Sequence, residues 1–491
     1  MNARTRHITA LFVLLTLAWP AVAYDRLLII TPSEFTGELD PLVRFKEASG
    51  RITFVETLSS IYATYGGADE PEQVKWCIVD YQQNEDVNMV LLVGDVDKFP
   101  TRWTFWGNEG QEEFHLTDLY YADLYADGTT NFETWDSNGN QLYSEVEFAP
   151  DGYINNDAID YLPDVAVGRI AASTGDEVTA YVSKVIAYEL RTRPDDGWFN
   201  TIGLYTGTWQ AVHNDRSDEV SAAMSPLGFI SIKRYTDWSG PSPVPPPGVP
   251  GVIVDDFNGG LGFASYMGHG NEWCWGCVDF CQSELGQVTN SHILPVATGV
   301  ACNTGSLAWH PGPHPYEDED GELHCGYNNG EAYDPGPYPH WDFPRPAPIQ
   351  SGDVSCPGGG VCGDCDLDRS CIGETFQFGN PPGMTGAIAY LGERGAGQAP
   401  ADEAVVFFYE GYAVGHRSLG GMWKYMIEQY YDYYDLGNSH TWSYPPADYG
   451  WGFTFDEARK FIVFGDPSLL VGGAFTNMQS GSVWDGGGGP W

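Results

Sequence analysis

Basic residues are scarce in this chain. Lysine and arginine together number 23, against 67 aspartates and glutamates, so the formal net charge is −44 over 491 residues. Nucleic acids and anionic membrane surfaces are bound through basic patches, and both are therefore poor partners. A strongly acidic surface suits calcium binding, cationic substrates or a salty exterior. A need for solubility alone explains much of the excess of acidic over basic residues. We expect protein or peptide partners, no nucleic acid, and a monomer.

Long apolar runs are also missing, except at the N-terminus. Residues 8–18 form an apolar run that follows two arginines and precedes the small residues Ala21-Val22-Ala23. This order is typical of a secretory signal peptide, with cleavage after Ala23. No later run is long and apolar enough to cross a bilayer. We therefore expect a secreted, extracellular chain without a membrane span.

The rest of the chain has the pattern of an α/β protein. Short apolar runs alternate with helical patterns, and this alternation predicts right-handed βαβ crossovers in a mostly parallel sheet flanked by helices. Thr174 and Glu177 form a capping box that predicts a helix start. The expected strands are 26–32, 51–57, 88–95, 201–207, 385–392 and a closing segment at 461–471, and the expected helices are 41–50, 71–83, 403–416 and 418–434.

Two of the apolar strands end in reactive side chains. Residues 261–270 end at His269, which stands between two glycines, and residues 293–303 end at Cys302. Nearly continuous apolar runs are typical of a parallel sheet covered on both faces. Ligands bind beyond the carboxyl ends of such strands. Two neighbouring strands that end at the same edge would place an imidazole beside a thiol.

A paired thiol and imidazole can perform nucleophilic catalysis. The imidazole lowers the pKa of the thiol and can later protonate a leaving amine. The backbone amides of Gly270 and Cys302 are candidate donors to an oxyanion, and the glycines would allow a sharp turn. The alternatives are a buried structural cysteine and a histidine in a structural turn.

The sequence around this pair resembles the gingipain-type cysteine peptidases, which have a caspase-like fold. Residues 252–276 contain a Gly-His-Gly, and residues 288–307 contain a Val-Ala-Cys. In that family these motifs carry the general base and the nucleophile, which fall here on His269 and Cys302. The likeness continues, in the family's order, through LLVGDVDKFP (91–100), TDLYYADL (117–124), LPDVAVGR (162–169), MTGAIAYLG (384–392) and VFGDPSLLV (463–471).

The resemblance implies an endopeptidase that works through a thioester and needs no cofactor for catalysis. The family places an acid that orients the histidine in the loop after the strand matching 201–207. Here that loop begins Thr208-Trp209-Gln210, so a two-residue dyad is expected, with Asp215 and Asp164 as candidate third acids. An inactive calcium-stabilised binding module and a transpeptidase remain the alternatives.

The resemblance also bears on specificity. The best-known family members cut after arginine or lysine and use an acidic residue in the first substrate pocket. The candidate pocket residues here are Asp215, Asp218, Glu219 and Trp273. A preference for a basic residue before the cut follows as a hypothesis.

An acidic stretch has the residue types of a calcium loop. Residues 136–145 place oxygen-bearing side chains at alternate positions around Gly139, without the late glutamate or flanking helices of an EF-hand. Related peptidases bind calcium, and three more aspartates lie nearby, so we expect a structural calcium site, with a solvated turn as the alternative. The candidate ligands are Asp118, Asp123, Asp127, Asp136, Asn138, Asn140 and Glu145.

Ten cysteines in an exported chain would normally pair. With Cys302 as nucleophile, nine remain, and Cys77 in a helical pattern is the expected second free thiol. Eight cysteines are then left for up to four disulfides. A zinc site at Cys274, Cys277 and Cys281 would need a fourth ligand, so a disulfide is expected there.

These features predict two subdomains with two insertions. Residues 24–200 form the first subdomain, with the acidic insertion at 125–160. Residues 201–473 form the catalytic subdomain, with a Cys/Gly/Pro-rich insertion at 310–370. Residues 474–491 show no periodicity and are expected to be a flexible tail.

Overall fold

The computed structural model describes most of the chain between Asp25 and Gly473. It covers residues 25–307 and 370–473, apart from 109–110, 127–128, 141–142, 150–151, 156, 396, 398–399, 435, 437–440 and 443–453, and it adds two short strands at 316–317 and 323–324. The predicted signal peptide, most of the Cys-rich insertion and the predicted tail lie outside these residues. None of the helices described is both long and apolar enough to cross a membrane.

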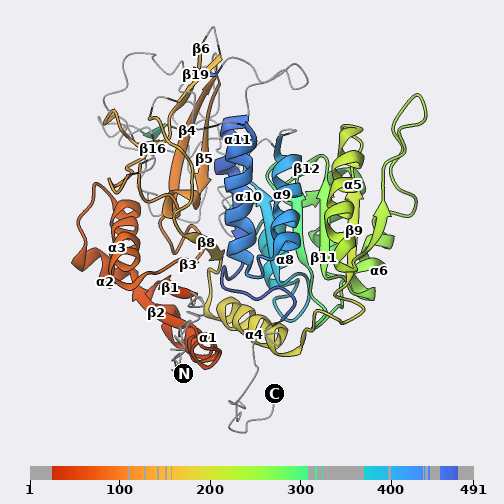
Figure 1. Cartoon of the computed structure of the whole chain (residues 1–491), viewed down its shortest axis with the longest axis horizontal. Helices are drawn as coiled ribbons and strands as arrows, with labels where there is room; N and C mark the ends of the chain where they lie inside the picture. Colours follow the sequence, from red (N-terminus) through yellow and green to blue (C-terminus); the bar gives the residue numbers. More distant parts are fainter. Residues whose placement is uncertain are drawn as a thin grey trace, which may run out of the picture.

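A ten-stranded sheet forms the centre of the molecule (Figure 1). Its strands are almost entirely buried, except at the two edges, because helices cover the sheet. The order is β10-β9-β11-β15-β18-β20-β8-β3-β1-β2. The bounds are β1 (Arg26–Thr31), β2 (Ile52–Thr57), β3 (Met89–Val93), β8 (Ala166–Ile170), β9 (Thr201–Thr206), β10 (Ile230–Arg234), β11 (Phe263–Met267), β15 (Val296–Val300), β18 (Ala389–Glu393) and β20 (Phe461–Phe464).

The two halves of this sheet run in opposite directions. Neighbouring strands are parallel throughout, except that β18 and β20 are antiparallel. The prediction of a mostly parallel sheet is therefore confirmed within each half. One consequence was not predicted: the amino end of β20 lies at the same sheet edge as the carboxyl ends of β11, β15 and β18.

Helices surround the sheet, and α5, α9 and α10 lie side by side over it (Figure 1). The predicted capping box of α4 is present: Thr174 Oγ1 accepts a hydrogen bond from Glu177 N, and Glu177 Oε2 accepts one from Thr174 N. The bounds are α1 (Thr36–Ala48), α2 (Leu58–Thr64), α3 (Glu70–Glu85), α4 (Gly175–Arg191), α5 (Val212–Met224), α6 (Gly251–Gly259), α7 (Gln282–Leu285), α8 (Ile372–Phe378), α9 (Pro400–Val414), α10 (Leu419–Tyr434) and α11 (Thr454–Lys460).

A second, five-stranded sheet stands beside the first (Figure 1). It begins earlier than the predicted insertion, with a hairpin whose strands alternate polar and apolar residues. The sequence analysis predicted no strands in this region, so the second sheet was missed. Its order is β19-β7-β6-β4-β5, with β4 (Arg102–Asn108), β5 (Gln111–Thr117), β6 (Val146–Ala149), β7 (Gly152–Asn155) and β19 (Thr441–Trp442).

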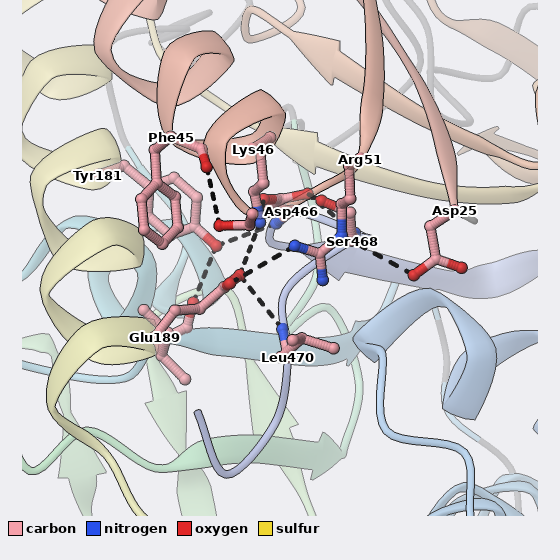
Figure 2. A network of polar contacts seen from close by, with 11 residues as sticks. Asp25, Phe45, Lys46, Arg51, Tyr181, Glu189, Asp466, Ser468 and Leu470 are labelled. Atoms are coloured by element: carbon pink, nitrogen blue, oxygen red, sulfur yellow. Dashed lines mark hydrogen bonds and ion pairs between the residues drawn. The ribbon is translucent and has the colours of Figure 1, made fainter. Parts of the chain in front are cut away.

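A buried network of charges ties the first helix to the last turn of the fold (Figure 2). Lys46 Nζ on α1 lies 2.6 Å from Glu189 Oε1 on α4 and 2.7 Å from Asp466 Oδ2, which follows β20. All three side chains are fully buried. Burial alone would raise the pKa of Asp466, but Lys46 holds it below its ordinary value. The network therefore joins segments from both ends of the chain.

The cysteines only partly match the prediction. Cys274 and Cys281 form a disulfide, and Cys77 is a buried free thiol, both as expected. Cys277 and Cys371 are free thiols as well, so the upper limit falls from the four disulfides expected to three. Cys371 is buried at the start of α8, and neither thiol has a cysteine partner among the residues described.

Candidate active site

His269 and Cys302 follow neighbouring strands in the same register. Strand β11 pairs in parallel with β15, and Met267 lies opposite Val300. The same offset, continued two residues further, sets His269 opposite Cys302. Gly268 N donates a hydrogen bond of 3.1 Å to Val300 O, so the pairing persists beyond the strands. Since neighbouring strands lie about 4.8 Å apart, the imidazole and the thiol come from adjacent positions on one sheet edge.

The backbone at His269 is held firmly while its side chain is exposed. The His269 carbonyl accepts hydrogen bonds from Tyr266 Oη at 2.7 Å and from Gly276 N at 2.8 Å. The imidazole lies against the indole of Trp209, with ring centroids 5.1 Å apart. Trp209 therefore occupies the place beside the histidine where sequence reasoning looked for an acid.

The two glycines beside His269 are needed for close approach, not for a sharp turn. Neither is among the residues with positive φ. A Cβ on Gly270 would lie 2.6 Å from the Ala301 Cβ, and a Cβ on Gly268 would lie 2.8 Å from the Gly207 Cα. Only glycine lets the histidine segment pack this tightly against the strand ends on either side.

Cys302 is a half-buried free thiol. Burial raises the pKa of the Cys302 thiol, and the carboxylates of Glu393 and Glu457 raise it further. The Gly397 N–H and the Lys460 ammonium act in the opposite direction but do not reverse the shift. The net shift is opposite to the one expected from a neighbouring imidazole, because burial outweighs the other influences. A raised pKa favours the neutral thiol over the thiolate.

The turn after Cys302 is fixed by hydrogen bonds to β18 and the segment that follows it. Asn303 N donates to Gly395 O at 2.9 Å, and Asn303 Oδ1 accepts from Gly395 N at 2.9 Å. In the described part of the chain, the Cys302 N–H donates to no backbone carbonyl. This amide is free of a backbone partner, and its role as an oxyanion donor together with the Gly270 amide stays a prediction.

Buried carboxylates near Cys302 were missed by sequence reasoning. Gly397 packs against both the Glu393 carboxylate and the Cys302 amide. Glu393 is fully buried, both of its carboxylate oxygens lack a hydrogen-bond partner, and burial raises its pKa well above the usual value. Glu393 directly follows the predicted strand 385–392. Because ligands bind beyond the carboxyl ends of such strands, this position could have identified Glu393 as a candidate site residue.

A second buried pair lies behind Trp209. His213 Nδ1 on α5 lies 2.6 Å from Asp402 Oδ2 on α9, and both side chains are 1% exposed. The Trp209 ring centroid is 5.8 Å from that of His213, so the indole contacts both histidine rings. This pair could not be found from sequence, because its members come from helices far apart in the chain.

Neither candidate third acid serves His269. Asp164 accepts hydrogen bonds from Leu124 N and Tyr125 N, and it precedes β8, four strand positions from β11. Four spacings amount to about 19 Å, too far to orient the ring. Asp215 is exposed on α5. Among the described residues no carboxylate forms a hydrogen bond or ion pair with His269, and Asp164 lies too far away to do so.

The candidate pocket residues lie on two different elements. Asp218 on α5 forms an ion pair with Lys233 and accepts a hydrogen bond from Tyr235, and Glu219 forms an ion pair with Arg216. Asp218 and Glu219 therefore already have balanced charges at the surface. Trp273, in the hairpin after His269, lines a pocket to which His269 and Cys302 do not contribute.

The candidate calcium ligands form one cluster and several outliers. Asn138 Nδ2 and Asn140 Nδ2 donate to Glu145 Oε2, at 3.1 and 3.0 Å, and Asp136 Oδ1 accepts from Asn140 N at 2.9 Å. Asp157, which was not predicted, accepts from Glu145 N at 2.8 Å.

The remaining calcium candidates do not join this cluster. Asp118 is paired with the buried Arg169, and Asp123 accepts a hydrogen bond from the Trp135 indole. Asp127 lies outside the described residues. The expected seven-residue set is therefore not a single site, because two of its members are bound elsewhere.

The fold and the paired side chains are those of the cysteine peptidase class. A helix-flanked sheet presents an exposed imidazole and a free thiol at adjacent strand ends, which is the arrangement that this chemistry requires. The chain belongs to peptidase family C25, whose family model matches residues 23–320.

Comparison with known proteins agrees with this family. Gingipain R2 of Porphyromonas gingivalis is 24% identical over 293 residues, covering 58% of this chain and 33% of that protein. Lys-gingipain W83 of the same organism is 25% identical over 218 residues, covering 44% of this chain and 10% of that protein. The chain thus spans about a third or less of the length of these relatives.

A solved structure supports the fold. The crystal structure of the Arg-specific cysteine proteinase gingipain R superposes with a TM-score of 0.56 at 19% sequence identity, covering 91% of this chain and 78% of that one. At this identity the likeness establishes the shared architecture alone.

Proposed function

We propose that this chain is an exported cysteine endopeptidase in which Cys302 is the nucleophile and His269 the general base. The observation that carries the proposal is the common register of β11 and β15, which sets the two side chains opposite one another. Family membership supports the reaction class. The predicted signal peptide and the Cys274–Cys281 disulfide support export, since disulfides persist in oxidising compartments.

The resting neutral thiol decides the order of proton transfer. His269 removes the Cys302 proton as the sulfur attacks the scissile carbonyl, so no charged pair has to exist beforehand. The Cys302 and Gly270 amides donate hydrogen bonds to the oxyanion. His269 then returns the proton to the leaving amine, and water hydrolyses the thioester to regenerate the thiol.

Preference for a basic residue before the cut is part of the proposal. The relatives include proteins named as Arg-specific and as Lys-gingipain. In this chain the carboxylate of Glu393, beside Cys302, is buried without a hydrogen-bond partner. A cationic substrate side chain beside it would favour the ionised form of this carboxyl group. Asp215, exposed on α5, is the other candidate.

A panel of fluorogenic peptides that differ only in the residue before the cut tests both the activity and this preference. We expect kcat/KM for arginine or lysine to exceed that for leucine or aspartate by about tenfold or more, because one charge-assisted contact contributes roughly 1.5–3 kcal/mol. Glu393→Gln should reduce the preference, with Asp215→Asn as the comparison. Fastest turnover after an acidic or apolar residue would reject the basic preference.

We also propose that calcium stabilises the loop at 136–145. Burial raises the pKa of Asp157 to about 7, and the neighbouring Glu145 and Asp136 carboxylates contribute to the rise. These oxygens suit calcium, which prefers oxygen ligands. Within the described residues no group of three acidic, cysteine or histidine side chains is arranged to hold a metal ion, so amide and backbone oxygens would have to complete the set.

Calcium should therefore raise the melting temperature of the protein. A ligand at about 100 times its Kd stabilises the folded state by about 2.7 kcal/mol, and a chelator should remove this gain. Asp136→Asn should abolish the response in differential scanning calorimetry, whereas the exposed Asp237→Asn should leave it unchanged. Equal melting temperatures with calcium and with chelator would refute the site.

A further inference from the structure

A pocket of about 370 Å³ lies apart from His269 and Cys302, neither of which lines it. It is bounded by α8, by the first turn of α4, and by the hairpin that follows His269. The volume lies within the range of small-ligand sites. Its lining includes Glu177, Trp273, Gln282, Glu374, Phe378 and Asn380.

The base of this pocket is acidic and unbalanced. Glu374 lines the pocket and is 2% exposed; its carboxyl group forms a hydrogen bond with Ser370, but its Oε1 atom has no partner among the described residues. Glu177 also lines the pocket, and its Oε2 atom already accepts hydrogen bonds from the capping box. Among the described residues, no basic side chain lines the pocket. A buried carboxyl oxygen without a partner is costly, and a cationic group that donated to Oε1 would remove this cost.

The electrostatics point the same way. Burial, followed by the charge of Asp95, raises the pKa of Glu374 well above its usual value. Burial likewise raises the pKa of Asp95, to about 8. The charge of Arg169 lowers the pKa of Asp95, but the Arg169 guanidinium is itself paired with Asp118. A positive group entering from the pocket would be stabilised by both carboxyls.

The walls suit an organic cation more than a metal ion. Trp273 and Phe378 supply aromatic surface, which attracts guanidinium and ammonium groups, and the amides of Gln282 and Asn380 supply hydrogen-bonding groups. In the part of the chain described here, no cluster of histidine, cysteine and acidic side chains has the arrangement of a metal site. The sizes and donors match the end of an arginine or lysine side chain.

We propose that this pocket binds the basic side chain of a protein ligand at a position separate from the bond-cleaving site. Recognition is by Glu374 at the base and Trp273 at the wall. The binding requires no catalysis, so it does not depend on the peptidase proposal.

The pocket is joined directly to the histidine hairpin. Ile372 N on α8 donates to Glu272 O at 2.6 Å, and Gln282 N donates to Trp273 O at 3.0 Å. Gln282 Nε2 also donates to Thr375 Oγ1 at 2.9 Å. A basic residue held here would therefore contact the same hairpin that begins at Gly270. In a protein substrate it would act as a second anchor beside the reacting peptide.

Calorimetric titration of the Cys302→Ala protein with N-acetyl-L-arginine amide tests the proposal. We expect saturable binding of the arginine amide. The neutral isostere N-acetyl-L-citrulline amide should bind with a Kd at least about tenfold higher. Glu374→Gln should weaken arginine amide binding by about tenfold, whereas Asp218→Asn, which removes an exposed carboxylate on α5, should leave it unchanged. Glu393→Gln should also retain this binding, which separates it from any site beside Cys302.

The opposite results would overturn the proposal. Equal affinity for arginine and citrulline amides would show that charge is not recognised, and unchanged arginine binding to Glu374→Gln would place the site elsewhere. If Glu374→Gln fails to fold by circular dichroism, Trp273→Ala is measured in its place and should show a similar loss. Peptide turnover by the unmodified chain is scored separately, so failure of the peptidase proposal would not be mistaken for failure of this one.

Discussion

Replacement of Cys302 by alanine should reduce kcat/KM by at least about 1,000-fold, and His269→Ala should cause a loss of similar size. The two side chains act as a unit, since the thiol rests neutral and cannot attack until the imidazole removes its proton. Activity is to be measured with the fluorogenic peptide that the unmodified chain cleaves best. Cys277→Ser is the matched control, because Cys277 is another half-buried free thiol near the same hairpin.

The pH dependence of alkylation provides an independent check of the same site. Burial raises the pKa of Cys302, so the thiolate fraction, and with it the rate of labelling by iodoacetamide, should rise steadily from neutral to alkaline pH. Rapid labelling near pH 5 would indicate a preformed thiolate and contradict the proton-transfer order given above. Full activity in Cys302→Ala would end the peptidase assignment, and transfer of the acyl group to an added amine would favour a transpeptidase.

Replacement of Lys46 by methionine should destabilise the fold by about 3–5 kcal/mol, because it leaves Glu189 and Asp466 buried together without their shared cation. Arg51, whose Nη1 atom lies 3.6 Å from Glu189 Oε2, compensates only in part. The free energy of unfolding is to be measured by urea denaturation followed by tryptophan fluorescence.

Lys98→Met is the control for Lys46→Met. Lys98 pairs with Glu34 at 3.2 Å, but both side chains are partly exposed, and such pairs contribute about 1 kcal/mol or less. If both substitutions lowered the free energy of unfolding by the same amount, the buried network in Figure 2 would stabilise the fold no more than an exposed ion pair does.

Local patterns predicted the parts of the fold that are local. The alternating apolar and helical segments gave the strands of both sheet halves, and Thr174 with Glu177 marked the start of α4 correctly. His269 and Cys302 could be paired because each stands at the end of a continuous apolar strand, and parallel strands present their carboxyl ends together. The neutral state of the Cys302 thiol could not be read in this way, since it depends on burial.

What sequence reasoning missed depends on contacts between distant segments. The reversed direction of β20 brings Glu457 and Lys460 from α11 to the edge that holds Cys302, and nothing in residues 461–464 signals that direction. The second sheet was overlooked because a polar, acidic composition was taken as irregular structure. Asp218 and Glu219 were considered pocket residues, although their partners Lys233 and Arg216 were not apparent from spacing.

The position of β20 has a consequence for how the protein is made. This strand comes from the C-terminal part of the chain, yet it lies between β18 and β8 and pairs with both. During synthesis the two parallel halves can each begin to form, but no strand lies between β18 and β8 until residues 461–464 leave the ribosome, and pairings this remote in sequence form slowly. A nascent chain that stops short of Phe461 should therefore expose the unpaired edges of β18 and β8.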